Sequence, residues 1–317
     1  MHIFRAASGS PRLVAWAALA VVYFMWGSTF TAIQVAVRTV PPFLMAGSRF
    51  LVAGAILYLV ALRSAPGRGR PTFRELRASA VVGLLLLLGA NGLVSWSELK
   101  VPSGMAALMI ATVPLWMAVL AAALSRRSGP GVVGWAGVAV GLLGVALLAG
   151  PGSGGRLQPL FAAALLLSSL LWAAGSLYSR TAPLPRSLLV ASALEMVAGG
   201  LGLLVLGAVS GELRQFHAQQ VGGPTLLAFS WLVVGGSLLG YSCYVFALSR
   251  LPTTTVATYA YVNPLVAIVL GWLILGQGLT LGTVAAAGLI TLGVVLMVSG
   301  PALARRRAAA LALAKGG

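Results

Sequence analysis

The chain alternates long apolar stretches with short polar linkers throughout its length. A hydrocarbon core about 30 Å thick needs roughly 20 apolar residues per helix, and ten stretches meet that requirement. Because lipid cannot satisfy backbone polar groups, the pattern predicts ten membrane helices rather than strands or loops. We place these spans at 13–37, 43–62, 76–97, 104–124, 131–150, 157–178, 187–209, 225–248, 255–275 and 280–299.

Prolines lie inside two of these stretches at matching positions. Segment 250–265 has a near-copy at 100–115, and the basic residue, both prolines and the final leucine recur 150 residues apart. A proline inside a helix removes a backbone hydrogen bond and frees a carbonyl. Interrupted helices at matching positions of two halves are typical of a transporter's binding site. We therefore predict that Pro114 and Pro264 interrupt spans four and nine and act as hinges.

Polar residues recur at helical spacing on four spans. Residues three and four apart share a helix face, and in lipid such a face turns toward the bundle interior or a cavity. An interhelical hydrogen bond, worth roughly 0.6 kcal/mol, explains any single one of them equally well. Taken together, the stripes favour a shared cavity. The residues are Asn91, Ser95 and Glu98 in span three, Ser168, Trp172, Ser176 and Ser179 in span six, Ser237, Tyr241 and Tyr244 in span eight, and Thr255, Tyr259 and Asn263 in span nine.

The predicted substrate site combines aromatic and polar side chains from this set. Trp26 and Trp172 recur 146 residues apart inside spans one and six, and we expect both to line the pathway. Aromatic rings suit flat apolar substrates through stacking and burial. They also suit cations, which leaves a drug cation open as the substrate. The substrate-binding candidates are Trp26, Asn91, Ser95, Trp172, Ser176, Tyr241, Tyr244, Tyr259 and Asn263.

Two charged residues, Arg49 and Glu195, lie within spans at matching positions. Each lies about 12–14 Å along its helix at 1.5 Å per residue, and entry from opposite sides lets them converge near the midplane. As a functional pair, Arg49 attracts a substrate carboxylate and Glu195 an ammonium group. A structural ion pair or snorkelling is the alternative. Glu98 and Glu195 are the acids in or beside spans, so they are the candidates for proton coupling.

Composition excludes several classes of protein. The chain is 59% hydrophobic and 8% charged, whereas soluble domains are roughly 25% charged. The net charge of +17 does not indicate a nucleic-acid binder, because the basic residues lie in short loops rather than on one face. An intramembrane enzyme is disfavoured, since the sequence has no aspartate, no histidine within a span and no paired acids. We predict neither a catalytic site, a cofactor nor a metal site.

The basic residues set the predicted orientation. With the N-terminus in the cytoplasm, sixteen lysines and arginines lie inside and four outside, and Arg49 lies within a span. This bias follows the positive-inside rule and places both termini in the cytoplasm. Ten spans divide into two sets of five, and because five is odd the second set enters from the opposite side. We expect repeats at 1–150 and 151–300, followed by a basic cytoplasmic tail at 301–317.

The run W-G-S-T-F at 26–30, Arg49 in span two, and the paired Pro114 and Pro264 resemble the drug/metabolite transporter superfamily. Among its members the chain is most similar to EamA-type permeases, and within those to bacterial amino-acid exporters. Many members carry a glutamate after span nine where this chain has Gln277, so the role of that acid is not carried over.

The resemblance implies an all-α integral membrane protein, with ten transmembrane helices in two inverted-topology five-helix repeats. Its partners would be the lipid bilayer and a small molecule, with no nucleic acid, and it would act as a monomer in the bacterial inner membrane. The expected function is export of aromatic and other neutral amino acids by alternating access. Multidrug or cationic-metabolite efflux is the alternative. A bare channel, or a tandem duplication without transport, is less favoured by the paired prolines and inverted repeat.

Overall fold

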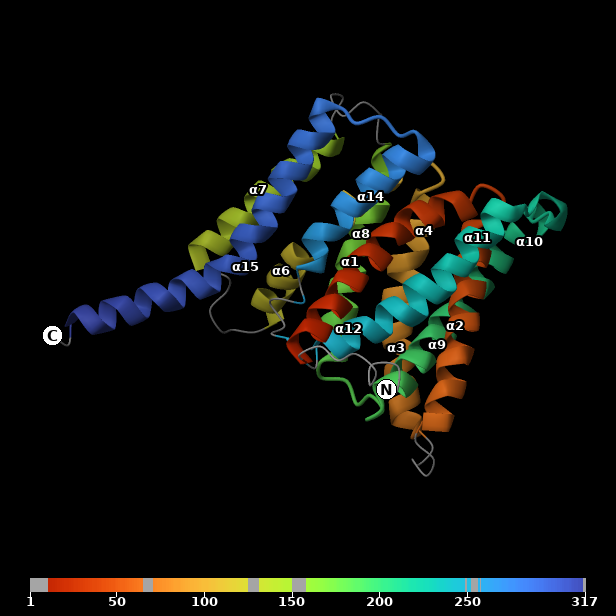
Figure 1. The fold of residues 1–317 in the computed structure, drawn as a ribbon, viewed down its shortest axis with the longest axis horizontal. Helices are drawn as coiled ribbons and strands as arrows, with labels where there is room; N and C mark the ends of the chain where they lie inside the picture. The colour runs from red at the N-terminus through yellow and green to blue at the C-terminus, as the bar shows by residue number, and fades with distance from the viewer. Residues whose placement is uncertain are drawn as a thin grey trace.

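The computed structural model describes residues 11–64, 71–124, 131–149, 158–248, 250–251, 256 and 258–315. All regular elements in these ranges are helices (Figure 1), which confirms the predicted all-α class. The elements are α1 (Pro11–Ala36), α2 (Pro42–Ser64), α3 (Phe73–Gly83), η2 (Leu84–Asn91), α4 (Gly92–Ser97), α5 (Ser103–Ile110), α6 (Val113–Leu124), α7 (Gly131–Ala149), α8 (Pro159–Ser179), α9 (Leu188–Val209), α10 (Glu212–Gln215), η3 (Ala218–Gln220), α11 (Gly223–Trp231), η4 (Leu232–Leu239), α12 (Gly240–Leu248), α14 (Tyr259–Leu275) and α15 (Leu281–Lys315).

Length and hydropathy assign these elements to spans. Within the described residues, eight helical segments are long and apolar enough to cross a membrane, and Val262–Leu275 and Leu281–Met297 are shorter apolar helices. Together they account for the ten predicted spans. Thr255, where we placed the start of span nine, lies outside the described residues. The last helix does not stop near residue 299 as expected, because α15 continues to Lys315.

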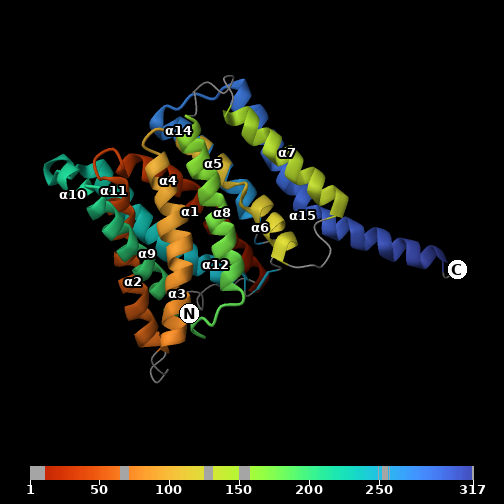
Figure 2. The ribbon, with the colours of Figure 1, turned by 180° about the vertical axis from the view of Figure 1, so that it is seen from behind.

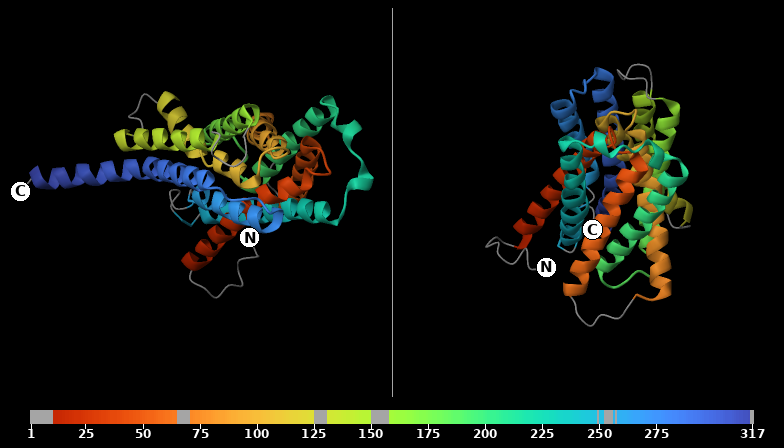
Figure 3. Two further views of the ribbon diagram at one scale, coloured as in Figure 1. Left: turned by 90° about the horizontal axis from the view of Figure 1, so that it is seen from above. Right: turned by 90° about the vertical axis from the view of Figure 1, so that its right-hand side faces the viewer.

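The bundle pairs the two halves of the chain in the same way twice. Helix α2 packs along α9, and α7 packs along α15. The first helix of each half packs against the third and fourth spans of the other half: α1 contacts η4, α12 and α14, and α8 contacts η2, α4, α5 and α6. The α7–α15 pair lies at the side of the bundle (Figures 1 and 2), and the end of α15 extends away from it (Figure 3).

We name the two ends of the bundle so that the site can be located. We call the end at which α1 begins the N-terminal end, and the end at which α1 stops and α2 begins the distal end (Figure 1). At the distal end the carboxylate of Glu212 accepts hydrogen bonds from the backbone amides of Phe43 (3.2 Å) and Leu44 (2.9 Å). A carboxylate at a helix N-terminus satisfies amides that have no partner within the helix. Glu212 therefore fixes the start of α2 against α10.

Glycines permit the closest helix contacts. A Cβ atom added at Gly83 would lie 2.2 Å from the backbone oxygen of Glu195, and one at Gly293 would lie 2.4 Å from the backbone nitrogen of Gly141. Such separations are far below van der Waals contact, so no larger residue fits without a shift of the backbone. Small residues let membrane helices approach in this way. These positions lock span three to span seven, and span five to span ten.

The two matching prolines have different surroundings. In span four the helix ends at Ile110 and resumes at Val113, directly before Pro114. A proline in the first turn of a helix removes an amide that would have had no intrahelical partner, so it costs little there. In span nine α14 begins at Tyr259 and continues through Pro264 as one helix. The expected interruption at Pro264 is therefore not present.

Candidate substrate site

Four of the five predicted pathway aromatics form one cluster near the N-terminal end. The ring centroid of Trp26 lies 5.0 Å from that of Tyr244 and 5.0 Å from that of Tyr259. The rings of Tyr244 and Tyr259 are 5.9 Å apart at 89°. Tyr241 joins the cluster 6.5 Å from Tyr244. Edge-to-face pairs at these separations are attractive beyond their buried area, so α1, α12 and α14 are joined through aromatic faces.

Polar groups border this aromatic cluster. The hydroxyl of Ser192 on α9 donates a short hydrogen bond to the hydroxyl oxygen of Tyr241. The carboxyl of Glu195, one turn further along α9, is near enough to act on Tyr241 electrostatically. The indole nitrogen of Trp26 donates to the backbone oxygen of Gly236 at 3.2 Å. The cluster therefore offers flat apolar faces with an acid at one edge.

Asn263, the residue before Pro264, bonds to both α14 and α1. The proline has no amide hydrogen, so the Ala260 carbonyl loses its intrahelical donor. With its amide nitrogen turned toward acceptors, Asn263 donates to the backbone oxygens of Tyr259 (3.1 Å) and Tyr23 (3.2 Å). One bond supports the turn before the proline and the other ties α14 to α1. Asn263 is buried and thus holds the helix that carries Tyr259.

No ring contact or hydrogen bond joins the remaining predicted lining residues to the cluster within the described ranges. Asn91 ends η2 and is half-buried. Ser95 is buried, and its hydroxyl has no hydrogen-bond partner among the described residues. Ser176 is half-buried, and its backbone oxygen accepts from the hydroxyl of Ser179. Trp172 is half-buried, and within the described ranges no ring contact joins it to the four aromatics.

The structure corrects the expected pairing of Arg49 with Glu195. Arg49 is buried, its Nε donates to the hydroxyl of Ser237 at 3.0 Å, and its guanidinium lies 4.8 Å from the Phe50 ring centroid. The acid that acts on it electrostatically is Glu98. Glu195 instead lies beside Tyr241. Although α2 and α9 pack along each other, their charged side chains reach different neighbours, and no ion pair joins the two in the described chain.

Two π-helical segments, which the sequence did not predict, occupy matching places. Segment η2 (Leu84–Asn91) lies in span three and η4 (Leu232–Leu239) in span eight. In η2 the Ala90 carbonyl accepts from the hydroxyl of Ser168 at 2.8 Å, and in η4 the Gly236 carbonyl accepts from Trp26. In each case the donor lies on the first helix of the other half. Such π-helical turns are rare and often occur at functional sites.

A glutamine network that the sequence did not predict joins two spans and a linker at the distal end. The side-chain oxygen of Gln34 accepts from the backbone amide of Ser103 at 2.9 Å and from the amide of Gln277. The Ser103 hydroxyl donates to Gln277 at 3.2 Å. Gln277 makes neutral hydrogen bonds in this network. The network links α1, α5 and the segment between α14 and α15.

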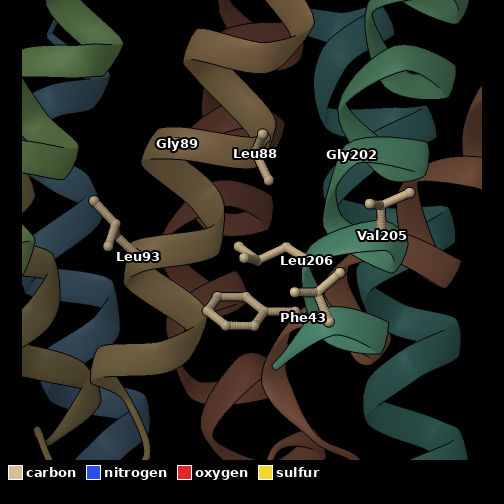
Figure 4. A pocket seen from close by; sticks show the side chains of 8 residues that line it. Phe43, Leu88, Gly89, Leu93, Gly202, Val205 and Leu206 are labelled. Carbon is tan, nitrogen blue, oxygen red and sulfur yellow. The ribbon is translucent and has the colours of Figure 1, made fainter. Parts of the chain in front are cut away.

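One cavity that the structure describes lies elsewhere. It has a volume of about 410 Å³ between α2, the η2–α4 segment and α9 (Figure 4). None of the predicted substrate-binding residues lines it, and every side chain around it is apolar. Its lining residues are Phe43, Leu88, Gly89, Leu93, Gly202, Val205, Leu206 and Val209. The aromatic cluster, and not this cavity, therefore carries the polar and aromatic chemistry of a candidate substrate site.

Comparison with known proteins identifies the family of this chain. The sequence profile of the EamA-like transporter family matches residues 13–150 and again residues 160–299. The chain belongs to the EamA-like transporter family. This transporter is 36% identical to the protein described as the uncharacterized inner membrane transporter YedA of Escherichia coli, over 89% of this chain and 90% of that protein. It is a membrane transporter with a small-molecule substrate, and it is not an enzyme.

More distant relatives of this EamA-like transporter include one whose description names a substrate class. A protein of Escherichia coli described as "Probable amino-acid metabolite efflux pump" is 26% identical over 88% of this chain and 90% of its own length. A protein of known crystal structure is similar with a TM-score of 0.63 and 20% identity, over 92% of this chain and 98% of that one. The structural likeness shows the shared fold alone.

Proposed function

We propose that this EamA-like transporter exports aromatic and other neutral amino acids by alternating access. The aromatic cluster of Trp26, Tyr241, Tyr244 and Tyr259 is the observation that carries the proposal. Its rings contact one another at centroid separations of 5.0 to 6.5 Å, and aromatic faces of this kind suit stacking with a phenylalanine side chain. The similarity to an amino-acid metabolite efflux pump supports the same substrate class.

The edges of the cluster supply groups for the amino-acid backbone. Glu195, beside Tyr241, is an acid that can pair with a substrate ammonium group. The Ala260 carbonyl, which Pro264 leaves without an intrahelical donor, is a second acceptor for that group. Asn91, Ser95, Trp172 and Ser176 remain proposed lining residues contributed by spans three and six. In this account they meet the substrate when the two halves of the bundle rearrange.

Alternating access would use the interrupted and weakened helices. The gap between α5 and α6, Pro264 in α14, and the π segments η2 and η4 lie in four spans that contact the first helices α1 and α8. Rocking at these points would open one end of the bundle while the other closes. We propose this motion for a monomer in the bacterial inner membrane, with both termini in the cytoplasm as the basic residues predict.

Counterflow into liposomes tests the substrate class. Purified protein is reconstituted with unlabelled phenylalanine inside, and uptake of radiolabelled phenylalanine is measured. We expect uptake above protein-free liposomes, inhibited by external tyrosine, tryptophan and leucine but weakly by lysine and glutamate. Tyr244→Ala should reduce uptake, and Trp135→Ala, whose side chain is exposed on α7, should not. Equal uptake by wild type and protein-free liposomes would overturn the proposed substrate.

A cationic substrate is the second candidate. Aromatic faces with Glu195 beside Tyr241 also suit a desolvated organic cation. Tetraphenylphosphonium added outside would then abolish phenylalanine counterflow, and labelled tetraphenylphosphonium would itself accumulate in the reconstituted liposomes. Accumulation of the cation without any phenylalanine uptake would favour multidrug or cationic-metabolite efflux over amino-acid export.

A further inference from the structure

Glu98 is a buried acid that no donor satisfies. It follows the last residue of α4, its side chain is 1% exposed, and neither carboxyl oxygen has a hydrogen-bond partner among the described residues. An ionised carboxylate in such surroundings loses its hydration without replacement. Burial therefore favours the neutral, protonated carboxylic acid at this position.

Arg49 is the charged residue whose field reaches Glu98. Arg49 lies on α2 and acts on the Glu98 carboxyl electrostatically. Its Nε donates a hydrogen bond to the hydroxyl of Ser237 instead. From α1 the backbone amide of Gln34 also faces the carboxyl, beyond hydrogen-bonding geometry. Lys100, the nearest basic residue along the chain, is exposed, and so is Arg38. The described helices α5 and α8 and segment η2, which surround this region, contain no charged residue.

Buried hydroxyl groups on α1 and α4 share the same lack of partners. The hydroxyls of Thr31 on α1 and of Ser95 and Ser97 on α4 are buried without a hydrogen bond in the described chain. Buried polar atoms that are left unsatisfied are costly and usually have a reason. Close to the distal end, the Gln34–Ser103–Gln277 network joins α1, α5 and the segment between α14 and α15.

We propose that Glu98 binds and releases a proton during the transport cycle, and that Arg49 exchanges between Ser237 and the ionised Glu98 carboxylate. The inference rests on the proposed transport function and names its coupling ion. With the proton bound, Glu98 is neutral and Arg49 stays on Ser237. When the proton leaves to water, the carboxylate attracts Arg49 away from η4. Because Ser237 lies in the second half of the chain, this exchange couples proton release to contact between the halves.

A proton fits this position better than a substrate ammonium group. A side chain that is 1% exposed leaves no room for an organic cation, whereas a proton needs none. Burial raises the pKa of Glu98 well above its usual range, against the opposing effects of Arg49 and of the Gln34 amide. The protonated form therefore persists to higher pH than it would for an exposed glutamate.

Infrared spectroscopy of the purified protein measures this proton directly. The chain contains four acidic residues, all of them glutamates (Glu75, Glu98, Glu195 and Glu212), so each carboxyl band can be assigned by Glu→Gln substitution. We expect a protonated-carboxyl band from Glu98 that persists above the pH range of ordinary carboxyl titration. Glu98→Gln should remove this band, and Glu75→Gln, at the exposed start of α3, should leave it.

A complementary variant covers the case in which Glu98→Gln does not fold. The triple variant Glu75→Gln, Glu195→Gln, Glu212→Gln retains Glu98 as its only acidic side chain, so a remaining band above the ordinary carboxyl range must belong to Glu98. A Glu98 carboxylate that is already ionised at about pH 5, an ordinary carboxyl behaviour, would overturn the inference. Ser237→Ala tests the exchange of Arg49: it should lower the pH at which the Glu98 band disappears. An unchanged midpoint in that variant would exclude the exchange.

A measurement of proton movement during transport distinguishes a failure of the Glu98 inference from a failure of the proposed transport function. Liposomes containing a pH-sensitive dye receive a phenylalanine gradient. Wild type should move protons together with phenylalanine, and Glu98→Gln should carry phenylalanine without proton movement. Phenylalanine transport by wild type without any proton movement would overturn the inference and leave the proposed function standing. If wild type carries no phenylalanine, the proposed substrate fails, while the infrared titration still decides whether Glu98 holds a proton.

Discussion

Spans four and nine carry the same proline and fold differently around it. In span four the helix stops at Ile110 and restarts at Val113, so Pro114 lies in the first turn of α6. In span nine Pro264 lies within the continuous helix α14. The side chain of Asn263, the residue before the proline, bonds to Tyr259 and Tyr23 and supports the turn. A matching sequence position therefore does not by itself determine whether a helix breaks.

Spans three and eight show the opposite relation, because different sequences adopt the same local structure. Their sequences differ across the matching segments, L-L-L-L-L-G-A-N and L-V-V-G-G-S-L-L, yet both form π-helical segments of eight residues. In both, a carbonyl is satisfied by a side chain from the first helix of the other half. The shared feature is thus an interaction between halves rather than a residue pattern. Mutations can test whether the two pairs of spans play equivalent parts in transport.

The largest effect is expected at Pro264. Pro264→Ala restores a backbone amide inside α14, where a proline is about 3 kcal/mol less favourable than alanine. The helix should become more stable, and exchange between the two open forms should slow by tenfold or more, on the order of 1.4 kcal/mol in the barrier. Thermal unfolding and phenylalanine counterflow measure the two effects. A variant with wild-type turnover would show that Pro264 is a packing feature.

A smaller effect is expected at the π segment of span three. Ser168→Ala removes the donor to the Ala90 carbonyl in a buried site. An unsatisfied buried acceptor costs about 1–3 kcal/mol, so the melting temperature should fall. Ser210→Ala serves as the control, since that hydroxyl bonds to Gly207 within one turn at the exposed end of α9. Equal stability of the two variants would mean that the bond between the halves does not stabilise η2.

Pro114 should give the smallest change in stability. Its place in the first turn of α6 suits proline and alanine almost equally, so Pro114→Ala should alter the unfolding free energy by less than about 1 kcal/mol. Transport should slow only modestly in this variant. The double variant with Pro264→Ala should be slower than either single one, if both spans move together. A double variant no slower than Pro264→Ala would confine the hinge to span nine.

The sequence was sufficient for the elements that depend on local pattern. Apolar length predicts the spans, and helical spacing predicts that Tyr241 and Tyr244 share a face. Contacts between residues that are far apart in the sequence could not be predicted from local pattern. Ser237 lies 188 residues from Arg49, and Gln277 lies 243 residues from Gln34, and several polar partners were available to each. The π segments depend on a small shift in hydrogen-bond register that leaves no residue signature.

The matched tryptophans Trp26 and Trp172 allow the most direct test of the account. Calorimetric titration of purified protein with phenylalanine gives the binding affinity for wild type, Trp26→Ala and Trp172→Ala. Trp26 contacts Tyr244 and Tyr259, so its loss should weaken binding by about 1–3 kcal/mol, the scale of a lost stacking surface. Trp172→Ala, outside the cluster, should weaken it less. Unchanged phenylalanine affinity in a folded Trp26→Ala protein would contradict the placement of the substrate site in the aromatic cluster.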